Sequence, residues 1–267
     1  MSFFVNNVEL KEATFNQQEV KSIYFNNHLI WEAANFEWPG WANATWEDVY
    51  NLCKAKQNGD IDAWPDDVVL GATKETTLST AILGTSTFTM RIIGLDIDGE
   101  GVITFDSKYL TDEDVTFSSL NTYQDNFYNY CNAKPYIKSL RKGAAAANYD
   151  SYNYRNGAVT YTDYYVWSLS EREVNVESLS CISVANSTPT RAECTYGVNA
   201  PYPYFTSDET RKKTVAGSST DYRWLTRTES FNIFTLREMK VIVSESGGIA
   251  GTESSSNIRF SPCFAIG

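Results

Sequence analysis

Short apolar stretches separated by turn residues dominate the hydrophobic pattern of this chain. Strand-like runs rich in β-branched and aromatic residues occupy residues 67–71, 87–95, 102–105 and 239–243. Residues 96–101 lie between two of these runs and contain two Asp and two Gly, which is typical of a turn. The pattern therefore predicts a mainly antiparallel sheet.

Helical spacing of apolar residues is confined to two longer segments. Thr45 followed by Asp48 has the pattern of a capping box, apolar residues recur at helical spacing after it, and Gly59 ends the segment. A second helix is predicted over residues 125–140, with an interruption at Pro135. The combination of short strands, two helices and long loops indicates an α+β domain with an antiparallel sheet.

The end of the chain organises the predicted sheet. Residues 222–230 and 258–266 are apolar and aromatic, and each stretch carries arginine. A final apolar strand must pair with one made earlier, so we expect it to close a sheet begun near the front of the domain. Ser170, followed three residues later by Glu173, predicts the start of a short helix after a strand.

The first 34 residues have a different pattern of very short strands. Residues 6–7 and 26–27 are Asn-Asn pairs that lie between two apolar segments, as in tight hairpins. A sheet this small is not stable alone, so residues 1–34 are expected to dock on a neighbour or a partner chain. Residues 35–40 end in Pro-Gly and are interpreted as a linker, which leaves residues 41–267 as the main domain.

The amino-acid composition limits the kinds of partner the protein can bind and the compartment in which it is made. The formal net charge is −11, and a nucleic-acid backbone requires clustered Lys and Arg, so no nucleic-acid partner is expected. No apolar run reaches the roughly 18 residues of a membrane span, and no basic signal-peptide segment opens the chain. Five cysteines without a Cys-x-x-Cys pair predict buried free thiols in a protein made in the cytoplasm, rather than a disulfide framework or a zinc site.

Candidate catalytic chemistry is sparse. The only histidine, His28, would have to serve any Ser-His-Asp or Cys-His system, and a surface turn histidine is the simpler interpretation. No phosphate-binding loop or hydrolase elbow is present. Glu171 and Glu173 are interpreted as residues of a helix N-terminus, where they complement the dipole.

The turn at residues 96–101 has two interpretations. Asp96, Asp98 and Glu100 alternate along it, and oxygen ligands at alternate positions can hold Ca²⁺. Asp-Gly is also a common hairpin signal, so a plain turn is the alternative. No other cofactor is predicted.

Tyrosine is the strongest positive feature of the sequence. The chain has 17 tyrosines, many of them in tracts at residues 149–165 and 196–205 beside Ser, Asn and Gly. This composition resembles that of antibody paratopes, and aromatic faces also stack on sugar rings. Packing within the domain is the alternative, and Arg223 and Arg227 are expected to pair with core acids. The candidate ligand-binding residues are Tyr152, Tyr154, Tyr161, Tyr202, Tyr204 and Trp224.

Seven short motifs follow one another along residues 41–267, at residues 45–50, 67–71, 91–98, 102–110, 166–173, 222–228 and 258–266. Their order resembles that of a domain of unknown function, DUF6273, that recurs in bacteriophage and prophage structural proteins. Ile97 stands where that family often has His, and Thr228 where it usually has Pro. The closing pattern is similar to that of C-type-lectin-like domains, including those of phage tropism proteins and formylglycine-generating-type folds.

Residues 20–31 are similar to a Val-x-x-Ile-Tyr-x-Asn-Gly-x-x-Val-Trp segment common in phage tail proteins. The two resemblances imply a virion protein of the tail tip or fibre, made in the host cytoplasm and assembled as a trimer. Residues 1–34 would bind other virion proteins, and a C-type-lectin-like domain at 41–267 would recognise a host-surface glycan or protein without catalysis. The alternatives are a capsid decoration or baseplate protein and a glycan-cleaving tail enzyme.

Overall fold

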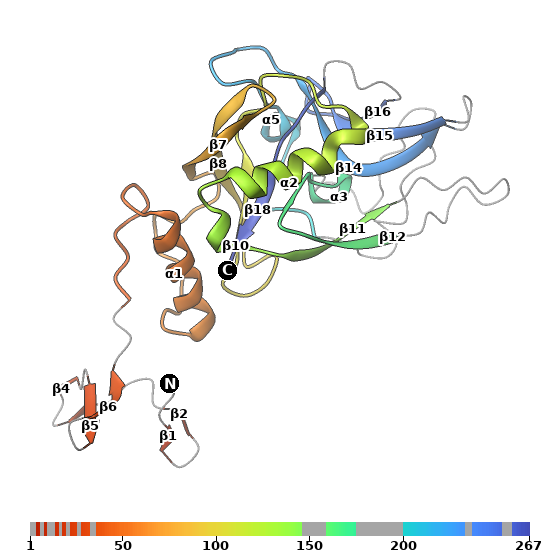
Figure 1. Cartoon of the computed structure of the whole chain (residues 1–267). Coiled ribbons are helices and arrows are strands. Elements are labelled where there is room, and N and C mark those ends of the chain that lie inside the picture. The colour runs from red at the N-terminus through yellow and green to blue at the C-terminus, as the bar shows by residue number, and fades with distance from the viewer. Residues whose placement is uncertain are drawn as a thin grey trace.

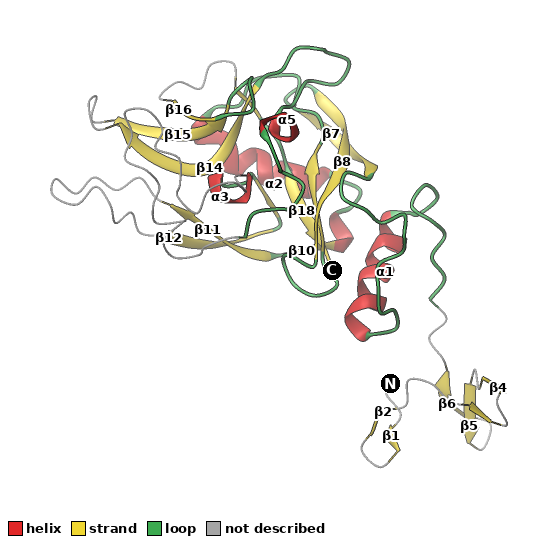
Figure 2. Cartoon of the chain, turned by 180° about the vertical axis from the view of Figure 1, so that it is seen from behind, coloured by secondary structure: helices red, strands yellow, loops and turns green. Residues whose placement is uncertain are grey.

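The computed structural model describes residues 36–145, 159–174, 200–232, 237–252 and 258–267, together with short strands within residues 4–32. Figures 1 and 2 show a mixed α+β arrangement with mostly antiparallel sheets and few helices, as the sequence predicts. Tyr152 and Tyr154 lie outside the described residues.

The main sheet has six strands and curls into a half-barrel. Its strand order is β10-β18-β9-β8-β7, and β13 also pairs with β18. The last strand pairs with β9 from Cys263↔Asp106 to Ile266↔Ile103. The prediction that the end of the chain closes a sheet begun earlier is therefore confirmed. The strands are β7 (Thr73–Ile82), β8 (Thr85–Leu95), β9 (Ile103–Ser107), β10 (Ile137–Lys138), β13 (Val166–Trp167) and β18 (Cys263–Ile266).

Helix α1 (Trp46–Asn58) has the ends that the sequence predicts. Thr45 and Asp48 form both hydrogen bonds of the capping box, and Gly59 is left-handed at φ 73°. The buried face of the helix packs on the main sheet, where the Cys53 thiol lies 3.5 Å from the Ile266 carbonyl oxygen.

The predicted helix over residues 125–140 is wrong in its bounds. The short helix η1 (Phe117–Ser119) leads into α2 (Leu120–Tyr130), and Cys131 is already extended. Pro135 does not interrupt a helix but lies at the start of a separate one, η2 (Lys134–Tyr136). Proline is accepted at a helix start because the amide hydrogen that it lacks would have no helical partner there.

The strand predicted at residues 67–71 is also wrong. Val68 is buried, but Val69 and Leu70 are exposed, and Gly71 turns the chain at φ +85°. The neighbouring strand is β7, which the hydrophobic pattern missed because its exposed positions are largely Thr and Glu. An edge strand with one solvated face needs few apolar residues.

A second sheet, a hairpin and two short helices complete the described chain. The four-stranded sheet has the order β16-β15-β14-β17, in which only β14 and β17 are parallel. Its strands are β14 (Arg223–Asn232), β15 (Arg237–Val243), β16 (Ile249–Thr252) and β17 (Ile258–Arg259). The hairpin is β11 (Leu140–Ala145) with β12 (Val159–Tyr164), and the helices are α3 (Glu171–Val174) and α5 (Asp208–Arg211).

Both faces of β18 are covered, which explains its continuous apolar sequence. Phe264 and Ile266 pack in the cluster beneath α1 and α2, whereas Cys263 and Ala265 pack in a second cluster with Trp167 and other aromatic residues. Successive side chains of a strand point to opposite faces, so one short strand joins the two cores.

The first 32 residues contain three strand pairs: β1 (Phe4–Val5) with β2 (Val8–Glu9), β3 (Thr14–Phe15) with β4 (Gln18–Glu19), and β5 (Ser22–Phe25) with β6 (His28–Glu32). The hairpins predicted around residues 6–7 and 26–27 are confirmed. The innermost pairs, Val5↔Val8, Phe15↔Gln18 and Phe25↔His28, recur every ten residues. The sequence did not predict the pair β3–β4, because its turn has Asn-Gln in place of Asn-Asn and its second strand is polar.

Candidate functional site

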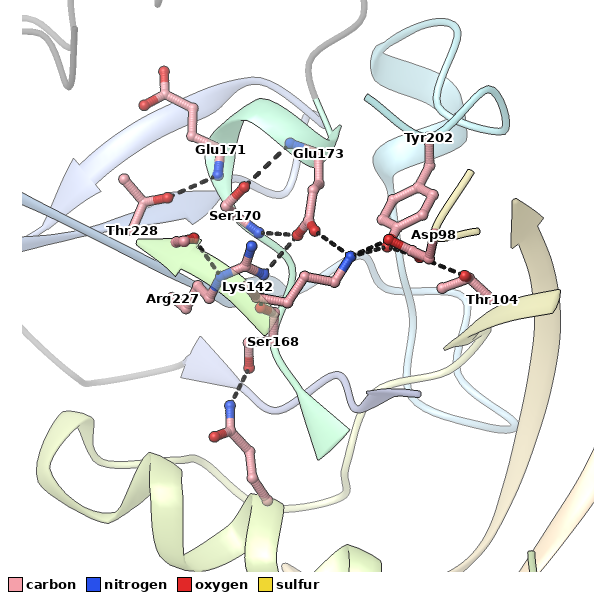
Figure 3. A network of polar contacts seen from close by, with 12 residues as sticks. Asp98, Thr104, Lys142, Ser168, Ser170, Glu171, Glu173, Tyr202, Arg227 and Thr228 are labelled. Carbon is pink, nitrogen blue, oxygen red and sulfur yellow. Dashed lines mark hydrogen bonds and ion pairs between the residues drawn. The ribbon is translucent and has the colours of Figure 1, made fainter. Parts of the chain in front are cut away.

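Glu173 lies at the centre of a buried network of charges (Figure 3). Ser170 and Glu173 form the predicted capping box, in which each backbone N–H donates to the side chain of the other residue. The same carboxylate accepts from Arg227 at 2.6 Å and lies 3.2 Å from the Lys142 ammonium. Its side chain is only 1% exposed, so the interpretation of Glu173 as a simple helix N-terminal residue was incomplete.

Lys142 links this carboxylate to the turn at residues 96–101. Its ammonium donates to Asp98 and, at 2.8 Å, to the Tyr202 hydroxyl. Tyr202 in turn donates to Asp98 at 2.7 Å, and Thr104 donates to the same carboxylate at 2.6 Å. Lys142, Arg227, Asp98 and Glu173 thus form a set of ion-paired groups with two cations and two carboxylates, whose formal charges balance.

Arg227 connects three separate elements. Its guanidinium donates to the Gly143 carbonyl in β11 at 3.1 Å and to the Ser168 carbonyl after β13 at 2.7 Å, while Arg227 itself belongs to β14. The strand β11 is therefore fixed to the core by a buried cation at Gly143, the residue directly opposite Tyr161. The prediction that Arg227 pairs with a core acid is confirmed, whereas Arg223 pairs with the exposed Glu245.

Burial and pairing act in opposite directions on the ionisation of this network. Burial disfavours the charged form of Glu173, but Arg227 and Lys142 outweigh it and hold the pKa of that carboxyl below its ordinary value. Burial likewise opposes the charge on Lys142, but Glu173 and Asp98 raise its pKa. Burial raises the pKa of Tyr202 well above its ordinary value. Tyr202 therefore stays a neutral donor, and Glu173 and Lys142 stay ionised at neutral pH.

The acidic turn is part of this framework of hydrogen bonds. Asp96 accepts from the Gly101 amide at 2.7 Å and from the Trp64 indole at 2.8 Å, and Asp98 is engaged by Lys142 as described. Glu100 is exposed. Within the described ranges, no group of His, Cys, Asp or Glu side chains is arranged to hold a metal ion. Protein donors engage both Asp carboxylates, which is what the plain-turn interpretation of these residues requires.

A second buried network lies around Asp106. Arg91 donates to this carboxylate at 2.7 Å, and Lys213 donates to its other oxygen at 2.6 Å. Lys213 also donates to the Ser107 carbonyl at 2.7 Å and lies 4.5 Å from the centre of the Trp224 ring. Burial lowers the pKa of Lys213 to about 8, even though Asp106 opposes this shift.

Two of the residues expected to contact a ligand belong to the core. Tyr202 and Trp224 are fully buried, and Trp224 donates to the Arg211 carbonyl at 3.0 Å. They are therefore packing residues, because large aromatic rings with a satisfied polar atom stabilise an interior. Tyr204 is half-buried beneath the guanidinium of Arg91, which lies 4.3 Å from its ring centre.

Tyr161 remains as an exposed candidate, together with a tyrosine that the sequence did not single out. Tyr161 is 52% exposed on β12, and the Arg141 guanidinium lies 5.7 Å from its ring centre. Tyr165 follows β12, is 45% exposed and stacks on Tyr128 of α2 with ring centres 4.3 Å apart. The stacking partner comes from another element, so no local pattern could have indicated this pair.

A groove of about 220 Å³ opens beside the β7–β8 turn. Its wall is about equally polar and apolar, with Phe88 and Leu110 beside Asp112 and several hydroxyl-bearing residues. The lining residues are Gly84, Thr85, Ser86, Thr87, Phe88, Ser107, Tyr109, Leu110, Asp112 and Ala216.

Three cysteines are free and buried, as the sequence predicts: Cys53, Cys131 and Cys263. Burial raises the pKa of Cys53 to about 12 and that of Cys131 to about 11. The remaining two, Cys181 and Cys194, lie outside the described residues.

No family model, curated protein or solved structure matches this chain. Each helix in the described ranges is too short or too polar to cross a bilayer. What the chain does must therefore be inferred from its own surface and core.

Proposed function

We propose that this chain is a bacteriophage virion protein of the tail tip or fibre that recognises a host-surface receptor. The observation that carries the proposal is the pair of exposed tyrosines, Tyr161 and Tyr165, on and beside a hairpin whose strand β11 is fixed to the core. Recognition sites combine rigid supports with amphipathic aromatic residues, because such residues lose little conformational entropy on binding.

The support for these tyrosines comes from the buried network. Lys142 and Arg227 hold the inner side of β11, and the six register pairs from Leu140↔Tyr164 to Ala145↔Val159 transmit that constraint to β12. A receptor that contacts Tyr161 would therefore meet a side chain on a pre-organised strand. Pre-organisation reduces the entropic cost of binding.

The proposal extends to the fold and the assembly. We assign residues 41–267 to a C-type-lectin-like domain, supported by the closing strand within an antiparallel sheet and by the two longer helices. We assign residues 1–34 to attachment to other virion proteins in a trimer. The ten-residue repeat of strand pairs supports this assignment, because such small hairpins gain stability by packing on neighbours.

The test is binding of the full-length chain to host cells. The Tyr161→Ala/Tyr165→Ala variant is compared with Val69→Ala/Leu70→Ala, which removes two exposed apolar side chains from another part of the surface. We expect the first variant to lose at least about tenfold in affinity, as removal of central aromatic contacts does, and the second to bind like wild type. Failure of the folded wild-type chain to bind host cells would refute the proposal in favour of a decoration or baseplate role.

A further inference from the structure

The exposed surface across α1, η2, α2 and the start of β13 carries a continuous series of tyrosines and lysines. Tyr50 of α1 lies 5.6 Å from Tyr136 of η2, measured between ring centres. Lys134 of the same short helix lies 4.9 Å from the ring centre of Tyr128, which stacks on Tyr165. Lys54 lies 5.2 Å from the ring centre of Tyr50. We call these six residues the tyrosine–lysine strip: Tyr50, Tyr128, Tyr136, Tyr165, Lys54 and Lys134.

Every member of the strip reaches solvent. Tyr165 is exposed, and the other five are half-buried. Figure 1 shows α2 crossing the domain near β10 and β18, and the elements of the strip contact one another in the order α1, η2, α2, β13. The strip is therefore one continuous surface rather than a set of scattered aromatic residues.

Among the described residues, the hydrogen-bond partners of the two lysines of the strip are amides and not carboxylates. Lys54 donates to the Gln57 amide oxygen at 3.0 Å, and Lys134 donates to the Asn129 amide oxygen at 3.0 Å. A neutral amide orients an ammonium without cancelling its charge. Lys212, by contrast, donates to the Glu209 carboxylate at 2.6 Å.

The surrounding sequence has a positive charge that is unusual for this protein. The net charge of the whole chain is −11, yet the stretch between Asp125 and Asp150 contains four cations and no acidic residue. Of these, Lys142 is buried against Glu173, and Arg141 has Asp163 as its cross-strand partner. The remaining two, Lys134 and Lys138, are half-buried in η2 and in β10 directly after it.

We infer that the tyrosine–lysine strip binds an anionic glycan, a chain of sugar rings that carries carboxylate or phosphate groups. This inference rests on the proposed function and specifies its ligand. Aromatic side chains bind the apolar faces of sugar rings, and lysines attract the anionic substituents. The strip holds two pairs of tyrosine rings, each with one lysine beside it, and so offers two places where a ring face and a charge of the same polymer can be bound together.

The test measures binding of the full-length chain to three immobilised polymers: polygalacturonate, a glycerol-phosphate teichoic acid and neutral dextran. The variant Lys54→Gln/Lys134→Gln is compared with Lys108→Gln/Lys212→Gln, which removes the same charge elsewhere. The control is matched because Lys108 also lies over a tyrosine, at 5.2 Å from the ring centre of Tyr109. The two acidic polymers distinguish carboxylate from phosphate.

We expect binding to at least one acidic polymer and none to dextran. The strip variant should bind about three- to tenfold more weakly, as the loss of two exposed ion pairs implies, and the control should match wild type. Added salt should weaken binding, because exposed charges are screened. A Tyr165→Ala variant should also bind less, through loss of the aromatic face.

Three results would overturn the inference: equal binding to dextran, no binding to either acidic polymer, or equal losses in the strip variant and the control. If host cells are still bound in any of these cases, the receptor-binding proposal stands and only the ligand class is wrong. Tighter binding of single-stranded DNA than of either polymer would assign the strip to nucleic acid instead.

Discussion

Removal of the Glu173 charge tests whether the buried network stabilises the fold. In Glu173→Gln the side chain keeps its shape, but Lys142 and Arg227 both lose the carboxylate that they contact. The four ion-paired groups, Lys142, Arg227, Asp98 and Glu173, go from a formal charge of zero to +1 in a region where Glu173 is 1% exposed. Breaking a buried pair in this way costs about 3 kcal/mol.

The assay is equilibrium urea unfolding followed by tryptophan fluorescence. With a urea m value of about 3 kcal/mol/M, a loss of about 3 kcal/mol lowers the midpoint by about 1 M. The matched control is Glu209→Gln, because Glu209 also contacts its cation at 2.6 Å but is 76% exposed. We expect no resolvable change in the control, since exposed pairs are solvated and screened.

A double-mutant cycle separates the charge effect from the loss of contacts. Lys142→Met alone leaves an excess negative charge, whereas Glu173→Gln/Lys142→Met restores neutrality. The double variant should therefore be more stable than the sum of the single losses predicts, by about 1 to 2 kcal/mol. Two results would refute the reasoning. One is a loss of unfolding free energy in Glu173→Gln no larger than that in Glu209→Gln. The other is a double variant whose loss equals the sum of the losses in Glu173→Gln and Lys142→Met.

Low pH should remove the stabilisation that the Glu173 carboxylate provides. The pKa of Glu173 is depressed in the folded state, so its stabilisation is complete above the ordinary value of 4.5 and is lost as pH falls below it. The difference in unfolding free energy between wild type and Glu173→Gln should accordingly shrink in acid. A difference that is constant from neutral to acidic pH would contradict this sign.

Three further predictions address other parts of the core. The pKa of Lys213 is about 8 in the folded protein, below its ordinary value of 10.5. As pH rises between these two values, the unfolding free energy of wild type should therefore increase relative to that of Lys213→Met. Urea unfolding of both proteins at several pH values measures the direction of this change. Gly101→Ala places a Cβ 2.8 Å from the Cys53 carbonyl oxygen, at a residue with φ +67°. It should lower the unfolding free energy more than Gly217→Ala does, because Gly217 also has a positive φ, +79°, but a Cβ there has nothing within 4 Å. We expect the difference to be about 2 kcal/mol, and equal melting temperatures would contradict it. The buried thiols of Cys53 and Cys263 should resist alkylation at pH 8 until the protein unfolds, as peptide mapping by mass spectrometry can show.

The sequence by itself determined the elements whose signals are local. Thr45 and Asp48 lie three residues apart, and Ser170 and Glu173 do likewise, so each capping box closes within one turn. The strand–turn–strand unit around residues 96–101 follows from a β-branched run and a Gly-rich turn. Such features need no knowledge of distant neighbours, because their hydrogen bonds form between nearby residues.

Only the tertiary structure decided which polar and aromatic residues are inside. Lys142 meets Asp98 across 44 residues, Arg227 meets Glu173 across 54, and Lys213 meets Asp106 across 107. A tyrosine in an aromatic tract has the same local pattern whether it is buried, as Tyr202 is, or exposed, as Tyr161 is. The difference depends on which elements the topology brings over it, and that is set by the packing of the whole sheet rather than by any window of sequence.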